Sequence, residues 1–283
     1  MKTVLVTGAS SGFGFKMVQD YLAAGWKVLA TVRNVENRTE IFIKELNLYP
    51  DRLTLLELDV TKEIQIKKIV DFLKNSENNK LDVLVNNAGF GAYGALEDIT
   101  MDQVRYQMEV NFFGPTNLIK NLLPSLRESR GKVINISSLM GRYSCPLASV
   151  YSASKYALEG LTEGLMYELN SFGIDVCTVQ PGGHRTNFVS SVNWGEDSFN
   201  DKSPYIGMSR GFKKMMDKLS ARKNAPGADG VSKAVLKLSH SSKMPRSVLV
   251  GIDAKFVGAL QVILPKFLYR IVMNIGNKFI FGV

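Results

Sequence analysis

Tyr151 and Lys155 lie four positions apart in the segment YSASK, and Ser138 lies thirteen residues before the tyrosine, at the end of the apolar segment KVINISS. If residues 150–172 form a helix, a four-residue step places the phenol and the ammonium group on one face, about one turn apart. A phenol titrates near ~10 and is a poor proton shuttle at neutral pH, but a neighbouring positive charge lowers that pKa. The pattern therefore predicts one shared site, in which Lys155 supplies that charge to Tyr151.

The elements that must position these side chains form an alternating pattern of short β-branched segments and longer amphipathic ones. The predicted strands are 2–7, 26–32, 52–58, 81–85, 132–137, 174–179 and 247–251, and the clearest helical patterns are 14–25, 101–126, 150–172, 208–222 and 228–240. Near-continuous apolar strands are typical of a parallel sheet that helices cover on both faces. We therefore predict an α/β fold with a doubly wound, seven-stranded parallel sheet (a Rossmann fold). Ligands of such folds bind beyond the carboxyl ends of the strands.

Length and composition fit one globular domain over residues 1–283, with 45% hydrophobic and 22% charged residues. The N-terminal apolar segment is too short to span a bilayer and is typical of a buried first strand rather than a signal peptide. The two cysteines, Cys145 and Cys177, and the two histidines, His184 and His240, have no metal-ligand spacing. We expect no metal site, no disulfide and a cytoplasmic protein.

The net charge of +9 is concentrated in the C-terminal third of the chain. Residues 1–201 carry 20 Lys and Arg against 23 Asp and Glu (−3), whereas residues 202–283 carry 15 against 3 (+12). Such asymmetry indicates an acidic partner, an anionic membrane surface or a nucleic acid, or else scattered surface lysines. We expect no nucleic acid, because no basic motif with interleaved aromatic residues and no helix-turn-helix pattern accompanies the charge.

A glycine-rich turn, TGASSGFG, joins the first predicted strand to the first helix. Glycine lets the backbone turn tightly and approach a pyrophosphate, while the N-terminus of a helix offers unpaired N–H groups and a partial positive charge. Its spacing, G-x-x-x-G-x-G, differs from the commoner G-x-G-x-x-G, so that other motifs must support a dinucleotide site.

Those motifs follow the other strands in order. They are Asp59 in ELDVT, the segment LVNNAG, Asn111, Ser138, Tyr151 with Lys155, and the pair Pro181-Gly182. From residue 1 to about 186 the chain resembles the short-chain dehydrogenase/reductase family. The segment VLATVRN, the length of the predicted lid and the extended C-terminus are most similar to the branch that contains 17β-hydroxysteroid dehydrogenases and retinol reductases.

The resemblance implies a role for each residue of the predicted catalytic site. Tyr151 would be the general acid/base, Lys155 would bind the nicotinamide ribose and lower the pKa of the tyrosine, Ser138 would bind the substrate oxygen, and Asn111 would hold a water that links Lys155 to solvent. Two alternatives stay open at this point. Asn111 could cap or kink its helix, and Ser137 could face the site, although the thirteen-residue spacing favours Ser138.

The resemblance also implies a set of cofactor-binding residues: Gly8, Ser10, Ser11, Gly12, Phe13, Gly14, Arg33, Asp59, Val60, Asn87, Ala88, Gly89, Tyr151, Lys155, Pro181, Gly182 and Thr186. Arg33 follows the second strand, and no acidic residue stands before Glu36 to bind a free ribose 2′-hydroxyl. A guanidinium there suits a 2′-phosphate, so we expect NADP(H) to be preferred, with NAD(H) not excluded. The alternative is that Arg33 is a solvated loop residue, since the turn lacks a basic residue beside Gly12.

Residues 1–182 are expected to hold the cofactor and the catalytic residues, and residues 183–225 to form a substrate lid. The aromatic residues of the predicted lid could contact an apolar substrate or pack against the core, and the sequence favours neither interpretation. Residues 255–283 form a basic, apolar C-terminal extension that Pro265 divides into two segments, each too short to span a bilayer. We expect it to pack within the protein or its oligomer, with contact to a membrane surface second.

The predicted function is that of an NADPH-dependent oxidoreductase acting on the carbonyl or alcohol of a small, hydrophobic, steroid-, retinoid- or ketone-like substrate. The predicted assembly is a homodimer or a homotetramer. The alternative is a catalytically silent dinucleotide-sensing protein that binds a membrane or a partner through its basic C-terminal third.

Overall fold

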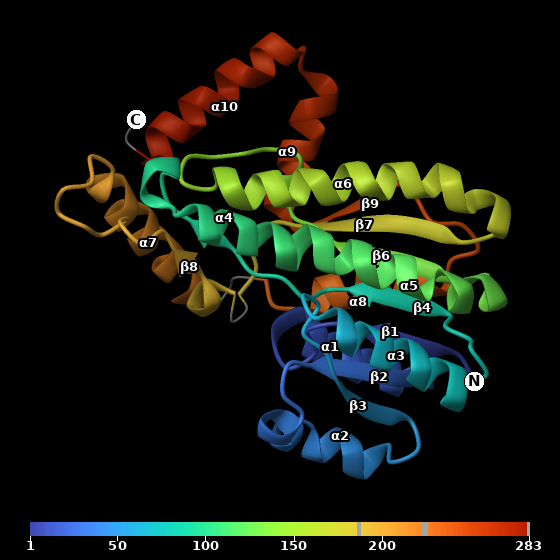
Figure 1. Ribbon diagram of the computed structural model, residues 1–283. Helices are drawn as coiled ribbons and strands as arrows, with labels where there is room; N and C mark the ends of the chain where they lie inside the picture. Colours follow the sequence, from blue (N-terminus) through green and yellow to red (C-terminus); the bar gives the residue numbers. More distant parts are fainter. Residues whose placement is uncertain (186–187, 222–225, 282–283) are drawn as a thin grey trace.

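Seven parallel strands form one central sheet in the computed structural model, which describes residues 1–185, 188–221 and 226–281 (Figure 1). The spatial order is β3-β2-β1-β4-β6-β7-β9. The strands are β1 (Thr3–Val6), β2 (Lys27–Val32), β3 (Leu53–Glu57), β4 (Val83–Asn86), β6 (Lys132–Ile136), β7 (Asp175–Pro181) and β9 (Ser247–Val250). The order reverses between β1 and β4, which is where a doubly wound sheet opens a binding crevice. The predicted fold and its seven strands are confirmed.

Helices cover both faces of the sheet because successive side chains of each strand point to opposite sides. Val4 and Val6 of β1 belong to the core beneath α1 (Gly12–Ala23) and α8 (Asp229–His240). Leu5 belongs to the core beneath α3 (Glu63–Ser76), α5 (Gly114–Ser129) and α6 (Ser149–Leu169). The short helix α2 (Ile43–Leu48) follows β2 on the α1 side. Burial on both faces explains why the strands read as continuous apolar segments.

The region predicted as one helix over 101–126 is two helices joined by a π-helical turn. Helix α4 (Met101–Met108) begins at Thr100, whose side chain forms a reciprocal capping box with Gln103. The π turn covers Glu109–Phe113, and α5 then begins at Gly114. Pro115 has no N–H group to donate to the carbonyl four residues earlier, that of Asn111, which accounts for the break in the regular helix.

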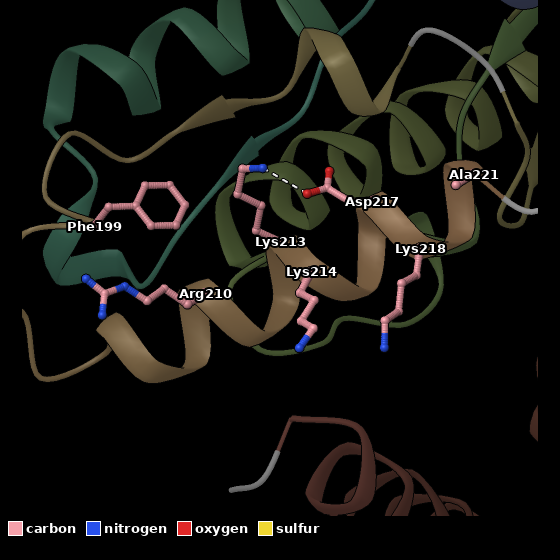
Figure 2. Close-up of a pocket in the computed structure, with 7 residues that line it drawn as sticks. All are labelled: Phe199, Arg210, Lys213, Lys214, Asp217, Lys218 and Ala221. Atoms are coloured by element: carbon pink, nitrogen blue, oxygen red, sulfur yellow. Dashed lines mark hydrogen bonds and ion pairs between the residues drawn. The ribbon is translucent and has the colours of Figure 1, made fainter.

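The C-terminal third adds helices outside the sheet layers. Helix α7 (Ile206–Ala221) has a row of basic side chains on its exposed side (Figure 2). Helices α9 (Ile252–Ile263) and α10 (Lys266–Phe281) lie on either side of Pro265, and α10 contacts both α9 and α7. In the described part of the chain, no helix combines the length and apolar character needed to cross a membrane. The boundaries proposed for the core, lid and extension stay predictions.

A second, two-stranded parallel sheet pairs β5 (Ala92–Tyr93) with β8 (Asn193–Trp194). The side chain of Gln103 supports it by donating a 2.8 Å hydrogen bond to the carbonyl of Trp194. Two-residue strands carry no periodic pattern, so the sequence did not predict them. Their pairing holds the segment around Asn193 and Trp194 against the segment that follows β4.

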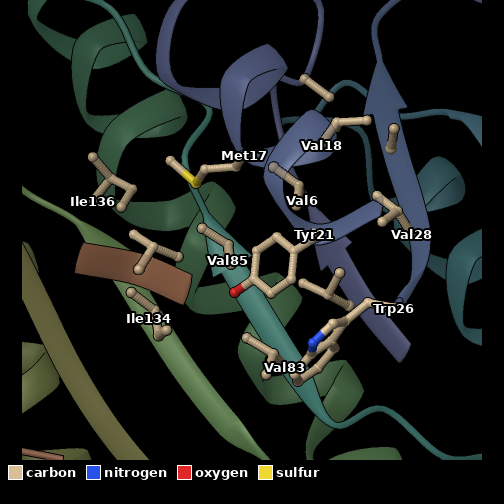
Figure 3. Packing of buried hydrophobic residues seen from close by; sticks show 14 of the residues in the cluster. Val6, Met17, Val18, Tyr21, Trp26, Val28, Val83, Val85, Ile134 and Ile136 are labelled. Atoms are coloured by element: carbon tan, nitrogen blue, oxygen red, sulfur yellow. The ribbon is translucent and has the colours of Figure 1, made fainter. Parts of the chain in front are cut away.

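The core beneath α1 and α8 packs around two large aromatic side chains (Figure 3). The rings of Tyr21 and Trp26 meet edge to face at 5.2 Å between centroids. The phenol of Tyr21 is fully buried and forms a hydrogen bond with the hydroxyl of Ser239 on α8. Burying a phenol costs little free energy when its hydroxyl has a hydrogen-bond partner. This contact therefore fixes α1 against α8.

Candidate active site

Ser138, Tyr151 and Lys155 come together where β6 ends and α6 begins. Tyr151 and Lys155 lie in the first two turns of α6, and both are buried. Ser138 follows β6 and begins a short 3-10 turn, in which its hydroxyl accepts a 3.1 Å hydrogen bond from the amide of Met140. The hydroxyl of Ser138 lies near enough to the phenol of Tyr151 to lower its pKa. Among the described residues the buried hydroxyl of Ser137 has no hydrogen-bond partner, which favours Ser138 as the serine of the site.

Burial, rather than Lys155, dominates the pKa of Tyr151. Burial raises this pKa to about 12, and the hydroxyl of Ser138 acts in the opposite direction. Burial also lowers the pKa of Lys155 to about 8, against the effect of the Glu159 carboxylate. Burial therefore outweighs any effect of Lys155 on this pKa, and the lowering of the tyrosine pKa by Lys155 stays a prediction. The ammonium nitrogen lies 5.8 Å from the centre of the phenol ring and donates a 3.0 Å hydrogen bond to the carbonyl of Ile136.

Glu159 is a member of this cluster that the sequence analysis missed. It lies one helical turn after Lys155 on the same face of α6, and its carboxylate accepts a 3.0 Å hydrogen bond from the hydroxyl of Thr178 on β7. The row Tyr151, Lys155 and Glu159 follows the i, i+4, i+8 spacing of one helix face. That spacing was the signal that could have revealed it.

Asn111 lies in the π turn and is buried. Its side-chain amide donates to the carbonyl of Phe90 at 3.0 Å and to the hydroxyl of Ser154 at 3.1 Å, and its oxygen accepts from the amide of Phe90 at 3.2 Å. Asn111 thus holds the loop after β4 against α6. A side chain added at Gly89 would stand 3.1 Å from the Asn111 oxygen and 3.6 Å from the Lys155 nitrogen, so these three residues share one corner of the site.

The glycine-rich turn lies against the loop that follows β4. The hydroxyl of Thr7 accepts hydrogen bonds of 2.9 Å from the amides of Asn87 and Ala88, and the Asn87 side chain donates to the carbonyls of Thr7 and Gly8. Gly8 has a φ of +64°, and a Cβ there would lie 2.9 Å from the backbone of Ala88. A Cβ on Gly14 would lie 2.4 Å from the Gly8 carbonyl. Thr7 was not predicted, because nothing in the sequence distinguishes it from an ordinary last residue of a strand.

A cavity of about 420 Å³ opens above this turn, at the carboxyl ends of the strands where the order reverses. Its lining includes eleven of the predicted cofactor-binding residues: Gly8, Ser10, Ser11, Gly12, Phe13, Arg33, Asp59, Val60, Asn87, Ala88 and Gly89. Sequence reasoning missed eight others: Val32, Leu58, Phe90, Tyr106, Val110, Phe188, Ser191 and Asn193. This cavity fits a dinucleotide phosphate. It combines glycines at which a side chain would collide with neighbouring atoms, the N-terminus of a helix and an exposed guanidinium.

The remaining predicted residues have different surroundings. Gly14 lies within the first turn of α1, and Tyr151 and Lys155 lie in α6 beside the cavity rather than in its lining. Asp59 uses its carboxylate to hold the amide and hydroxyl of Thr61. Thr186 lies outside the described residues.

Pro181 ends β7, and the turn that follows it is held by the end of β9 and the start of α9. The amide of Gly182 donates to the carbonyl of Val250 at 2.9 Å, and the amide of Gly183 donates to the Asp253 carboxylate at 2.6 Å. A Cβ at Gly182 would lie 2.1 Å from the same carboxylate. The segment that follows β9 therefore supports the end of β7 directly, through the first turn of α9.

Apolar and aromatic side chains surround Tyr151 on the lid side. The rings of Tyr93 and Phe188 lie 5.5 and 5.8 Å from the Tyr151 ring. Phe212 of α7 and Trp194 of β8 pack in the same cluster. An apolar molecule with one polar oxygen suits such surroundings, because only that oxygen needs the Ser138 and Tyr151 hydroxyls.

Comparisons with known proteins agree with this geometry. The short chain dehydrogenase family matches residues 2–197. The chain is 41% identical to a 3-ketodihydrosphingosine reductase of Bacteroides thetaiotaomicron over 194 residues, 68% of each chain. A short-chain dehydrogenase from Streptomyces avermitilis superposes with a TM-score of 0.80 at 35% identity over 93% of each chain. A short-chain dehydrogenase from Burkholderia cenocepacia, solved with NADP, has a TM-score of 0.72 at 25% identity, covering 95% of this chain and 98% of its own. The chain belongs to the short-chain dehydrogenase/reductase family of oxidoreductases.

Proposed function

We propose that this protein is an NADPH-dependent reductase of ketones or aldehydes with a substantial apolar part. One observation carries the proposal: a buried tyrosine, close to Ser138 and followed one turn later by a buried lysine, lies beside a cavity that fits a dinucleotide. Two hydroxyl donors that converge at one point suit a carbonyl oxygen on which negative charge develops.

Each residue of the site has a separate role in carbonyl reduction. A bound nicotinamide dinucleotide would supply the hydride. Tyr151, with a pKa of about 12, is protonated at neutral pH and holds the proton that the substrate oxygen needs. Ser138 offers a second hydroxyl to that oxygen. Lys155, with a pKa of about 8, is mainly charged at pH 7 and stabilises the tyrosine once its proton has left.

The preference for NADPH is supported by the residues at the end of β2. Arg33 is exposed and lines the cavity just after Val32, where a guanidinium meets a 2′-phosphate by charge-assisted hydrogen bonds. The relative from Burkholderia cenocepacia binds NADP. NADPH use favours reduction as the working direction, and the protonated state of Tyr151 suits the same direction.

The proposed substrate is an amphiphilic ketone or aldehyde, with the aromatic cluster around Tyr151 holding its apolar part. The relative from Bacteroides thetaiotaomicron is named for the reduction of 3-ketodihydrosphingosine, a long-chain ketone. The panel of candidate substrates therefore includes long-chain 3-ketones beside steroids, retinal and short ketones.

The test is oxidation of NADPH over that panel by the wild type, Tyr151→Phe and the matched control Tyr167→Phe. Tyr167 lies on the same helix and is exposed, so its variant should keep full activity. Tyr151→Phe should lose at least ~100-fold in kcat/KM, the usual contribution of a general acid, with thermal unfolding unchanged. Full activity of Tyr151→Phe would overturn the role of Tyr151, and dinucleotide binding without turnover on any substrate would favour the dinucleotide-sensing alternative.

A further inference from the structure

Helix α10 has a side that contacts the protein, an exposed apolar side, and exposed basic side chains at the boundary between them. Tyr269 and Asn277, two turns apart, face the protein: Gln261 donates a 3.2 Å hydrogen bond to the phenol of Tyr269, and Tyr143 donates one to the side chain of Asn277. These contacts fix the rotation of the helix about its axis. The apolar side and the basic side chains are therefore held toward solvent.

The exposed apolar side of α10 continues onto α9. Its members on α10 follow the i, i+4, i+8 spacing of one helix side: Phe267, Leu268, Ile271, Val272 and Ile275, all exposed. On α9 the exposed apolar side chains include Phe256, Val262 and Ile263, with Val262 81% exposed. Contiguous exposed apolar side chains of this kind mark an interaction surface rather than ordinary surface composition.

The basic side chains of α10 flank its apolar side. Lys266, Arg270 and Lys278 recur at four- or eight-residue steps and are exposed. An amphipathic helix with basic residues beside an apolar face is the pattern of helices that lie in the plane of a membrane surface.

Helix α7 places further positive charge next to α10. Figure 2 shows Lys214 and Lys218 projecting from α7 on the side where α10 lies, while Arg210 extends toward Phe199, and all four line a hollow of about 450 Å³. Arg210 pairs with Asp201 at 3.1 Å. Within the described residues, Lys214 and Lys218 have no carboxylate within ion-pair distance, so their charge is available to a ligand.

We propose that the apolar face of α9 and α10, together with the basic rows of α10 and α7, forms a docking surface for an anionic lipid bilayer. Acyl chains would meet the apolar face while lipid phosphates meet the flanking lysines and arginines. A second copy of this chain fits less well. A symmetric contact through this face would bring the same basic rows together in a region that carries a net charge of +12 over residues 202–283.

Docking at this surface would take place beside the catalytic residues. Gln261 of α9 exchanges two 2.9 Å hydrogen bonds with Arg142, which lies between Ser138 and Tyr151 in the sequence. The opposite side of α7 carries Phe212 and Met216 into the aromatic cluster around Tyr151. The surface goes beyond the proposed function, and it would give the site direct access to substrates dissolved in the bilayer.

The test is co-sedimentation of the full chain with vesicles of phosphatidylglycerol and phosphatidylcholine, compared with phosphatidylcholine alone. We expect binding to the anionic vesicles that weakens at high salt. Ile271→Asp and, one turn earlier, Phe267→Asp should each reduce binding at least ~10-fold, since each places a charge on the apolar face that would be buried in the bilayer. Lys214→Gln should reduce it about fivefold, corresponding to ~1 kcal/mol for one basic residue near the surface.

Matched controls come from α3, away from this surface. Ile64→Asp and Lys68→Gln change exposed residues of the same types and should leave vesicle binding unchanged. Tyr151→Phe should also bind vesicles like the wild type, which separates this inference from the proposed function. Unchanged binding by both α10 variants would overturn it. The proposal would also be overturned if the wild type bound no vesicles but self-associated, and Ile271→Asp abolished that self-association. The apolar face would then join two copies of the chain.

Discussion

The ammonium group of Lys155 donates a 3.0 Å hydrogen bond to the main-chain carbonyl of Ile136, the last residue of β6. This bond ties the first turns of α6 to the strand that ends two residues before Ser138. The proposed catalytic lysine is therefore positioned by a main-chain acceptor. The same burial lowers its pKa to about 8, so that its protonation changes within the range of ordinary assays.

Replacing Glu159 with Gln should shift the pH dependence of catalysis. Activity that needs the charged lysine falls as the pH rises through about 8, the pKa of Lys155. The Glu159 carboxylate raises that pKa, so its removal favours the neutral lysine and moves the fall in kcat/KM to lower pH. The measurement is a pH profile of kcat/KM from pH 6 to 10. Glu168→Gln, an exposed carboxylate on the same helix, should leave the midpoint in place, and a midpoint that rises in Glu159→Gln would refute this account.

The sequence predicted the sheet because burial on both faces leaves a local mark on every strand. Each strand is a short apolar segment, and each ends at a residue where the next motif begins. Tyr151 and Lys155 were likewise visible, since a four-residue step on one helix is a local relation. Features that depend on a single element could be predicted from the sequence.

Features that depend on contacts between distant segments could not be predicted. Thr7 supports Asn87 and Ala88 from eighty residues away, and Thr178 of β7 holds the Glu159 carboxylate of α6. The direction of the Tyr151 pKa also escaped prediction, because the extent of burial is a property of the packed molecule. A sequence shows which charge lies near a group, but it does not show how much water is excluded.

Gly14→Ala should weaken dinucleotide binding, whereas Gly160→Ala should not. The new methyl group at position 14 would lie 2.4 Å from the Gly8 carbonyl and 2.6 Å from the Asn87 amide, so the glycine turn must shift. We expect at least a ~10-fold higher Kd for NADPH, corresponding to the ~1.4 kcal/mol that a tenfold change requires. At Gly160, within α6, nothing lies within 4 Å of the new methyl, and stability should rise by about 0.5–1 kcal/mol. Fluorescence titration and urea unfolding measure the two effects. Equal NADPH affinity in the two variants would contradict the proposed role of the turn.

Arg33→Asp should invert or abolish the preference for NADPH over NADH. The change removes the guanidinium that lines the cavity after β2 and places a carboxylate where the 2′-phosphate would lie. We expect the ratio of kcat/KM values for the two cofactors to fall at least ~100-fold, about the value of two charge-assisted hydrogen bonds. Arg38→Asp makes the same change in charge at an exposed residue outside the cavity lining, and it should keep the wild-type ratio. An unchanged ratio in Arg33→Asp would show that Arg33 is a solvated loop residue.

Gln261→Ala should loosen the segment between Ser138 and Tyr151, which Gln261 contacts at Arg142. The variant loses both 2.9 Å hydrogen bonds between α9 and Arg142, each worth about 1 kcal/mol. The amides of Gly141, Arg142 and Tyr143 are hydrogen-bonded within the turn after Ser138, so their exchange with deuterium reports its opening. We expect exchange there to rise roughly 10- to 30-fold, the factor that ~1.4–2 kcal/mol implies. Gln65→Ala, which removes hydrogen bonds to Asp59 and Glu57, should raise exchange near those residues and leave the Ser138 turn unchanged. If Gln261→Ala leaves the turn equally protected, the C-terminal extension does not support the catalytic segment, and docking at α10 would have no direct route to it.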